Sequence, residues 1–169
     1  WDKHFQLAAD LNLAAYTGEQ FNLIGTMREK FVGTFDGAGH TIANFTYDSM
    51  FANDIGLFGY VSGFGARIED LGLIDPNVAA RYGFSSGALV GCLEEGTVAG
   101  CFVEGGTVTG HAQTGGLVGY CYDGTIANCH STGTVVGQNK IGGLVGMNFG
   151  QLSGCYTLGS VTGQYDVGG

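Results

Sequence analysis

The chain has 169 residues, 44% of them hydrophobic, which is enough for one domain with a sizeable core. Only 12% are charged, and a formal net charge of −9 disfavours nucleic acid and anionic lipid as partners. Although 33 residues are glycine, the hydrophobic content and the single proline argue against a disordered glycine-rich linker. No apolar run approaches the roughly 20 residues that span a bilayer, so we expect no membrane insertion.

The first 31 residues are the least regular part of the chain. Short alternating apolar segments at 5–7 and 11–13 predict strands, although the alanines and leucines of residues 7–16 would also suit a helix. We favour strands, and we expect residues 1–31 to form an irregular coil or cap, since an open solenoid end must be protected against edge pairing. The start at Trp1 rather than Met predicts a mature product or a piece of a longer chain.

A repeated pentapeptide organises residues 32–169, which we expect to form one continuous domain. Gly-Gly-Leu-Val-Gly occurs at residues 115–119 and 142–146, and looser copies occupy residues 55–59 and 87–91. Measured at the second residue, the copies begin at 56, 88, 116, 143 and 169, so the intervals are 32, 28, 27 and 26 residues. Self-similarity at such a period predicts a solenoid.

Two further apolar segments follow each pentapeptide. The first ends in cysteine in three copies, as at residues 97–101, and the second is a short Gly-Thr-Val or its equivalent, as at residues 106–108. Three short extended segments with glycine-rich corners are what one coil of a parallel β-helix requires. We therefore predict an all-β, right-handed parallel β-helix of about five coils, the hand following from the general rule for parallel crossovers.

Equivalent residues of successive coils should form ladders. Ile126 and Cys129 are three residues apart and cannot both face inward along a flat strand, so we expect a bend near Asn128. Which residue of each Leu-Val pair faces the core stays open. The expected ladders are Leu57, Leu89, Leu117 and Leu144; Phe58, Val90, Val118 and Val145; Ile42, Ile68, Val98, Ile126 and Leu152; and Phe45, Leu71, Cys101, Cys129 and Cys155.

The five cysteines carry no CxxC pair, so a finger-like metal site is not expected. Three of them fall in one column, where disulfides are conceivable. Stacked side chains in register point the same way, however, and free cysteine is a small hydrophobe that is often buried. We favour a buried thiol ladder over disulfides.

The polar motifs suit turns better than catalysis. Asp36 and His40 flank a glycine-rich segment in which every residue fits a corner, and the acidic pairs at 69–70 and 94–95 lie beside turns, where charges face water. The four histidines have no zinc-binding spacing, and the nonapeptide of calcium-binding β-rolls is missing. We expect no enzymatic activity, no cofactor and no metal site.

Aromatic residues and one strand edge are the candidate interaction surfaces. Aromatic rings on a solenoid could stack on sugar rings or form a partner surface, and they could equally pack into stabilising ladders. The candidate assembly edge is Val167, Gly168 and Gly169, because an unpaired edge templates another strand. The candidate ligand or partner residues are Tyr120, Tyr122, Phe149, Tyr156 and Tyr165.

These columns resemble the bacterial repeat proteins that carry the GLUG motif. The resemblance rests on residues 116–120 with 128–130, on residues 143–146 with 154–156, and on residues 33–42, which look like the segment that precedes such repeats. It covers the chain from about residue 31 onward. Ala88 in place of glycine and the longer first interval depart from the pattern, so we expect a loop within residues 55–87.

The resemblance implies secreted or cell-surface proteins in which the repeats form a stalk or an adhesive region, and it implies no conserved reaction. We therefore expect an extracellular structural or adhesive module. Its partners would be further copies stacked head to tail into a filament, or the adjoining repeats of a longer chain. The alternative is a module that binds or processes polysaccharide, with an extracellular glycan as the partner.

Overall fold

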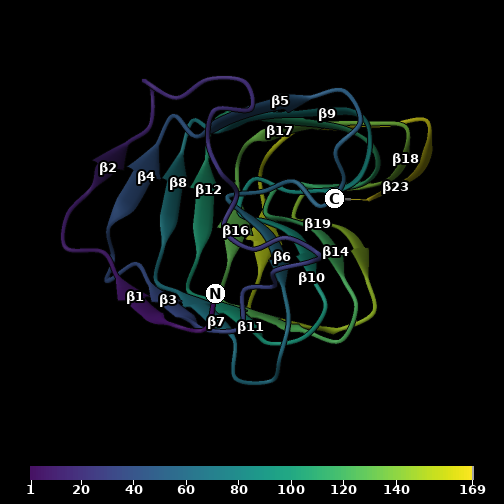
Figure 1. Ribbon diagram of the computed structural model, residues 1–169. Helices are drawn as coiled ribbons and strands as arrows, with labels where there is room; N and C mark the ends of the chain where they lie inside the picture. The colour runs from purple at the N-terminus through teal and green to yellow at the C-terminus, as the bar shows by residue number, and fades with distance from the viewer. Residues whose placement is uncertain (169) are drawn as a thin grey trace.

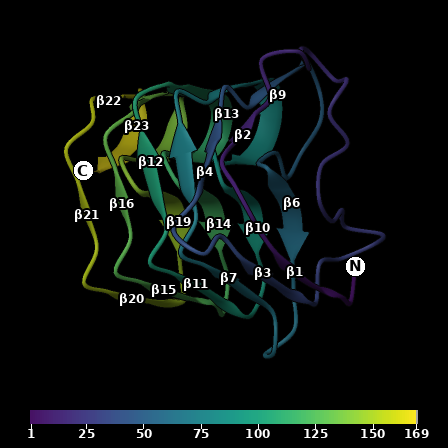
Figure 2. The ribbon, with the colours of Figure 1, turned by 90° about the vertical axis from the view of Figure 1, so that its left-hand side faces the viewer.

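The computed structural model describes residues 1–168 and holds strands and turns but no helix within them. The chain winds repeatedly through four sheets of parallel strands, which we call sheets A, B, C and D (Figure 1). From β3 onward it visits them in the order A, B, D, C, whereas the first turn has no strand in sheet D. Six strands of sheet A mark six turns, one more than the sequence predicts. Successive turns stack along one axis, with the first and last turns at opposite ends (Figure 2).

Sheets A and B each take one short strand from every turn. In sheet A these are β1 (His4–Gln6), β3 (Thr34–Asp36), β7 (Arg67–Glu69), β11 (Thr97–Ala99), β15 (Thr125–Ala127) and β20 (Gln151–Ser153). In sheet B they are β2 (Leu11–Asn12), β4 (Thr41–Ala43), β8 (Gly72–Ile74), β12 (Phe102–Glu104), β16 (His130–Ser131) and β21 (Tyr156–Thr157).

Sheets D and C close each turn. Sheet D contains β5 (Thr46–Ser49), β9 (Asn77–Ser86), β13 (Thr107–Gly115), β17 (Thr134–Val136), β18 (Asn139–Gly142), β22 (Val161–Thr162) and β23 (Tyr165–Gly168). Sheet C contains β6 (Phe58–Val61), β10 (Val90–Leu93), β14 (Val118–Cys121) and β19 (Val145–Asn148).

The additional turn is the first one, at the N-terminus. β1 pairs in parallel register with β3, and β2 pairs with β4. Ile24 and Phe31 then bridge to Phe58 and Val61, so residues 24–31 supply the first level of sheet C. This turn contains no copy of the pentapeptide, so the repeat in the sequence does not reveal it. The strand prediction near residue 11 is confirmed over the helix.

Two expected ladder positions were wrong. Ile42 pairs with Leu73 in sheet B rather than with Ile68 in sheet A, whose partner is Phe35. The amide of Asn77 donates to the carbonyl of Phe45, which places Phe45 one corner beyond the cysteine column. The cause is residues 37–40, which lengthen the corner between β3 and β4 and so shift the alignment by one sheet. Both side chains are buried all the same.

The longer interval between residues 56 and 88 comes from two insertions. Residues 62–66 connect β6 to β7, where the next turn needs only residues 94–96. Within β9, residues 81–83 lie opposite the single residue His111 of β13, where the register shifts. Each insertion adds two residues, so the expected loop is divided between a connection and a bulge.

The pentapeptide forms the corner at which sheet D meets sheet C. Its first glycine ends the sheet D strand, the second glycine and the leucine form a bend, and the valine begins the sheet C strand. Because the backbone bends between them, Leu117 and Val118 are both fully buried. The leucines at the three equivalent corners, Leu57, Leu89 and Leu144, are buried as well.

Glycine is required at this corner because two backbones approach too closely for a side chain. A Cβ atom on Gly119 would lie closer than 3.0 Å to the backbone of Ser85 and Ser86 in the preceding turn. A Cβ atom on Gly146 would meet Gln113 and Thr114 in the same way. The last glycine of the motif therefore lets one turn rest directly on the backbone of its neighbour.

The corner between sheets A and B relies on left-handed backbone geometry. Asn128 has φ of 54°, and its counterparts Asp70, Gly100 and Gly154 have φ of 51°, 62° and 63°. The predicted bend near Asn128 is thus confirmed. Asparagine, aspartate and glycine tolerate this conformation better than other residues, which explains why only these three occur in the column.

The cysteine column follows this corner, and all five cysteines are free thiols. The Sγ of Cys129 lies 3.2 Å from the carbonyl oxygen of Ala127 and 3.7 Å from that of Val98 in the preceding turn. Cys101 and Cys155 repeat both contacts in their own turns. Each thiol thus donates weakly to backbone carbonyls while filling a small site in the core.

Another residue with left-handed backbone geometry is Asp54, whose φ is 54°. Burial raises the pKa of its carboxyl to about 6, and a hydrogen bond with Ser85 opposes part of that rise. Within the described residues the chain therefore carries one carboxyl that loses its proton well above the usual range for aspartate.

We predict that Gly119→Ala destabilises the protein by about 3 kcal/mol or more, because the new methyl group collides with backbone that cannot rotate away. Urea unfolding followed by circular dichroism measures the loss. Gly65→Ala is the control, since a Cβ atom there meets nothing within 4 Å, and it should change stability by less than about 0.5 kcal/mol. Equal effects of the two variants would contradict the close backbone approach.

We predict that Cys155 reacts first with a thiol reagent. It is half-buried in the last turn, whereas the other four thiols are buried. Burial raises the pKa values of Cys92, Cys121 and Cys155 alike, so access to the reagent decides the order. Ellman's reagent at pH 8 should modify one thiol quickly and all five after denaturation, and Cys155→Ser should remove the fast phase. Fewer than five thiols in denaturant would indicate a disulfide and contradict the thiol column.

We predict that Asp54→Asn makes stability less dependent on pH. A raised pKa in the folded state means that folding favours the protonated carboxyl, so its contribution is lost as the pH rises from about 4 to about 6. The variant should be more stable than the parent by about 1 kcal/mol at pH 7, allowing for partial solvent exposure, and equal to it at pH 4. Unfolding titrations at both pH values test this, and a difference that does not depend on pH would contradict it.

Candidate functional site

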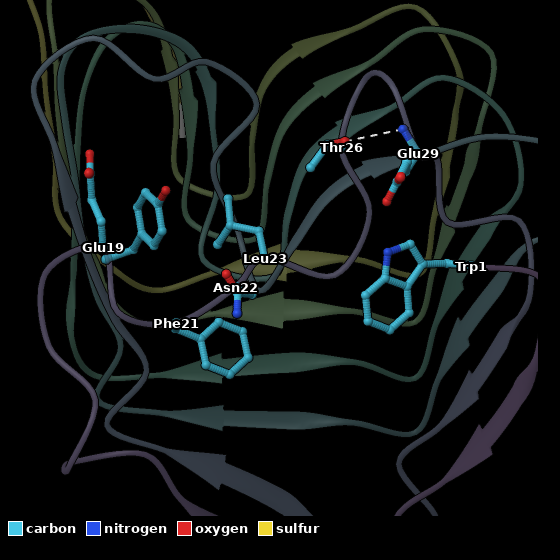
Figure 3. A pocket seen from close by; sticks show the side chains of 8 residues that line it. Trp1, Glu19, Phe21, Asn22, Leu23, Thr26 and Glu29 are labelled. Carbon is cyan, nitrogen blue, oxygen red and sulfur yellow. Dashed lines mark hydrogen bonds between the residues drawn. The ribbon is translucent and has the colours of Figure 1, made fainter.

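A cavity of about 590 Å³ lies at the N-terminal end of the stack, where residues 19–29 cross the first turn (Figure 3). The indole of Trp1 and the ring of Phe21 lie on opposite sides of it, with Leu23 between them. Thr26 and Glu29 close a tight turn on its rim, since the amide of Glu29 donates to the Thr26 hydroxyl at 3.1 Å. The lining residues are Trp1, Glu19, Phe21, Asn22, Leu23, Thr26, Glu29 and Tyr47.

This cavity has an apolar floor and two rim carboxylates. Phe21, Leu23 and Tyr47 are partly buried and pack against the core, so the floor is a continuation of the solenoid interior. The lining contains no histidine, cysteine or basic side chain to act with the carboxylates. The lining residues cover part of the hydrophobic interior, and they do not form an acid–base pair.

Lys30 anchors residues 24–31 to sheet C, beside the cavity. Its ammonium donates to Glu94 of the third turn and lies 5.1 Å from the centre of the Tyr60 ring. This ion pair and a hydrogen bond with Ser62 hold the pKa of Glu94 below its usual range. Burial and the nearby carboxylate of Asp54 raise the pKa of Cys92 to about 12, so its thiol is protonated at neutral pH and is a poor nucleophile.

Three of the five predicted aromatic residues meet at the corner between sheets C and A. The ring of Tyr120 lies 6.2 Å from that of Tyr122 and 6.2 Å, edge to face, from that of Phe149. A shallow cleft of about 370 Å³ opens here, lined by Tyr122, Asp123 and Phe149. Tyr122 follows β14 and Phe149 follows β19, so the two rings stand on consecutive turns.

The other two predicted aromatic residues lie elsewhere. Tyr156 belongs to sheet B, where its ring stacks on His130 at 4.9 Å, and His130 stacks on Phe102 at 5.3 Å. Tyr165 belongs to β23 of sheet D and pairs in register with Asn139. The five residues thus form one cluster and two separate positions.

The sequence prediction missed Asp123 in the cleft and His130 in the stack. Both could have been found from the repeat columns. Asp123 directly follows Tyr122, and His130 stands at the same place in its turn as Phe102 and Tyr156. The repeat alignment assigns both residues to their columns, but it does not show which columns lie next to each other on the surface.

The last turn exposes apolar residues whose counterparts are buried. Leu152 is 49% exposed, whereas Ile126, its partner one turn earlier, is fully buried. Val167 is 47% exposed, whereas its partner Ile141 is 1% exposed. Val167 and Gly168 are the last described residues of β23, and Gly169, the third residue of the predicted assembly edge, lies outside the described residues.

The remaining polar motifs serve the turns. The Asp36 carboxylate accepts the amide of Ala38 at 2.7 Å, and His40 contacts Asp10 at 3.3 Å. Among residues 1–168, no group of three or more histidine, cysteine, aspartate or glutamate side chains is placed to hold a metal ion. The same residues include no helix of the length and apolarity that a membrane crossing requires.

Comparison with known proteins identifies one turn of the fold. The family model described as the GLUG motif matches residues 110–136, which run from within β13 through the pentapeptide corner to the end of β17. Comparisons with curated proteins and with solved structures gave no significant match. Residues 110–136 are therefore a GLUG motif, and this motif is one turn of a parallel β-solenoid.

Proposed function

We propose that this chain is a non-catalytic structural module of an extracellular stalk or adhesive fibre, and that the stalk lengthens by adding further repeats to the last turn. The observation that carries this proposal is the contrast between the exposed residues of the last turn and their buried counterparts. A surface built from core residues in strand register is the surface that a further turn would cover.

The energetics of the stack support a mechanical role. Each turn pairs only with the turns before and after it, and from the second turn onward sheet D takes part in this pairing as well as sheets A, B and C. Stability therefore accumulates turn by turn, and lengthening the stack adds a nearly constant contribution. A rod of this kind transmits force along its axis through many strand ladders at once.

An extracellular location is part of the proposal. It is supported by the GLUG motif at residues 110–136 and by the low content of charged residues with an acidic balance. Four of the five free thiols are compatible with this location, because burial shields them from oxidants. Protease treatment of intact cells that produce the native protein tests it: degradation without lysis is expected, and full protection would contradict the location.

We predict that appending a copy of residues 144–169 after Gly169 forms a seventh turn. Gly168 and Gly169 take the place of Gly142 and Gly143, so the added segment continues the repeat. Covering Leu152, Leu158 and Val167 should raise Tm by several degrees, since burying each such side chain is worth about 1.5–3 kcal/mol before the entropy of ordering the new turn is subtracted.

Hydrogen exchange of the amides in β20–β23 gives the second readout, because these amides should exchange more slowly once a further turn covers them. A scrambled segment of the same composition is the control. An extended chain that behaves like the scrambled one would contradict stacking on this edge. Electron microscopy of the parent chain at high concentration separates the alternatives: discrete particles support the stalk, and fibres would favour head-to-tail copies.

A further inference from the structure

We propose that the cleft formed by Tyr122, Asp123 and Phe149 binds a neutral glycan chain laid along the solenoid axis. The proposal goes beyond the structural role, because it assigns a ligand to one corner of the stack. It stands on the position of two aromatic rings, on one carboxylate and on the spacing of the turns.

The two rings are presented to solvent rather than packed into a ladder. Tyr122 is 57% exposed and Phe149 is 63% exposed, although each begins from a backbone position held by the preceding turn. Tyr120 braces both rings from beside them, at 6.2 Å from each. The cleft thus has preformed apolar walls, and the C–H face of a sugar ring is a suitable surface to stack on them.

Asp123 supplies the polar group that a sugar requires. It is the one ionisable side chain other than tyrosine in the lining of this cleft, and it is exposed. A carboxylate can accept hydrogen bonds from two adjacent hydroxyl groups of a sugar. These bonds fix the orientation of the sugar ring, which stacking alone does not. Glu94, one turn away, is occupied by Lys30, so Asp123 is the carboxylate free to serve this role in the cleft.

Charge selects the class of glycan. The chain carries a formal charge of −9, and the lining of the cleft contains an acidic side chain, Asp123, but no basic one. A polyuronate would be repelled, and a sulfated chain more so. Neutral hexose polymers meet the apolar walls and the carboxylate without that repulsion.

The repeat of the solenoid favours a chain over a single sugar. Consecutive turns are separated by about 4.8 Å, the usual distance between paired strands. A sugar ring in an extended β-1,4-linked chain advances by nearly the same distance. Because Tyr122 and Phe149 occupy the same position in consecutive turns, a chain parallel to the axis would pass over both rings.

Native affinity electrophoresis tests the proposal with hydroxyethylcellulose, glucomannan and mixed-linkage glucan as neutral probes, and with polygalacturonate and alginate as charged ones. At least one neutral polymer should retard the chain, and the polyuronates should not. Isothermal titration with oligosaccharides of the retarding polymer should show weaker binding for shorter chains.

Variants locate the binding. Tyr122→Ala and Phe149→Ala should each weaken binding by at least about tenfold, and Asp123→Asn should weaken it by a smaller factor. Tyr165→Ala is the matched control, because Tyr165 is a similarly exposed ring (66%) on sheet D. Unchanged thermal unfolding of Tyr122→Ala and Phe149→Ala confirms that these variants fold.

Three results would overturn the proposal: no retardation by any neutral polymer, stronger retardation by polyuronates, or binding that survives the Tyr122→Ala/Phe149→Ala double substitution. None of these would affect the structural role, which the added seventh turn tests separately. A structural purpose for the two rings would instead appear as a fall in Tm without any change in glycan binding.

Discussion

The fold depends on one steric constraint, the direct approach of two backbones at the corner between sheets D and C. A Cβ atom at Gly119 or Gly146 would collide with the end of a sheet D strand in the preceding turn, and one at Gly91 would collide with the backbone of Asp54 and Ile55. Glycine therefore determines how closely successive turns approach at this corner. Because the backbone bends beside the glycine, the side chains of both the leucine and the valine point into the core. The pentapeptide recurs between turns for the sake of geometry, since close contacts with neighbouring backbone or side chains account for its glycines without a ligand.

Stacking creates both the stability and the exposed surfaces of the module. Each turn buries the apolar face of its neighbour, so apolar side chains fill the interior along the axis, and the last turn exposes residues whose counterparts in earlier turns are buried. At the corner between sheets C and A, by contrast, the side chains of Tyr122, Asp123 and Phe149 are exposed and take no part in the core. The ligand surface we propose lies on a corner for that reason, while the extension surface lies on an end.

Much of this architecture could be predicted from the sequence where the pentapeptide is present, because its period of 26–28 residues in the later turns aligns every ladder. Ile42 was misplaced because residues 37–40 lengthen a corner without changing the apolar pattern, and the first turn was missed because it has no pentapeptide. A column shows which residues share a register, but it does not show which neighbouring columns face outward together. Hence Tyr120, Tyr122 and Phe149 form one cluster, whereas Tyr156 and Tyr165 are separate from it.

The close backbone approach can be measured directly in solution. In a nuclear Overhauser spectrum of the isotope-labelled chain, the α-protons of Gly119 should give a strong cross-peak to the amide proton of Ser86, and those of Gly146 should give one to the amide of Thr114. Both pairs are distant in the sequence, so only contact between turns can produce the signals. Strong cross-peaks at both positions are the predicted result; their absence in the folded protein would show that glycine does not set the spacing of the turns.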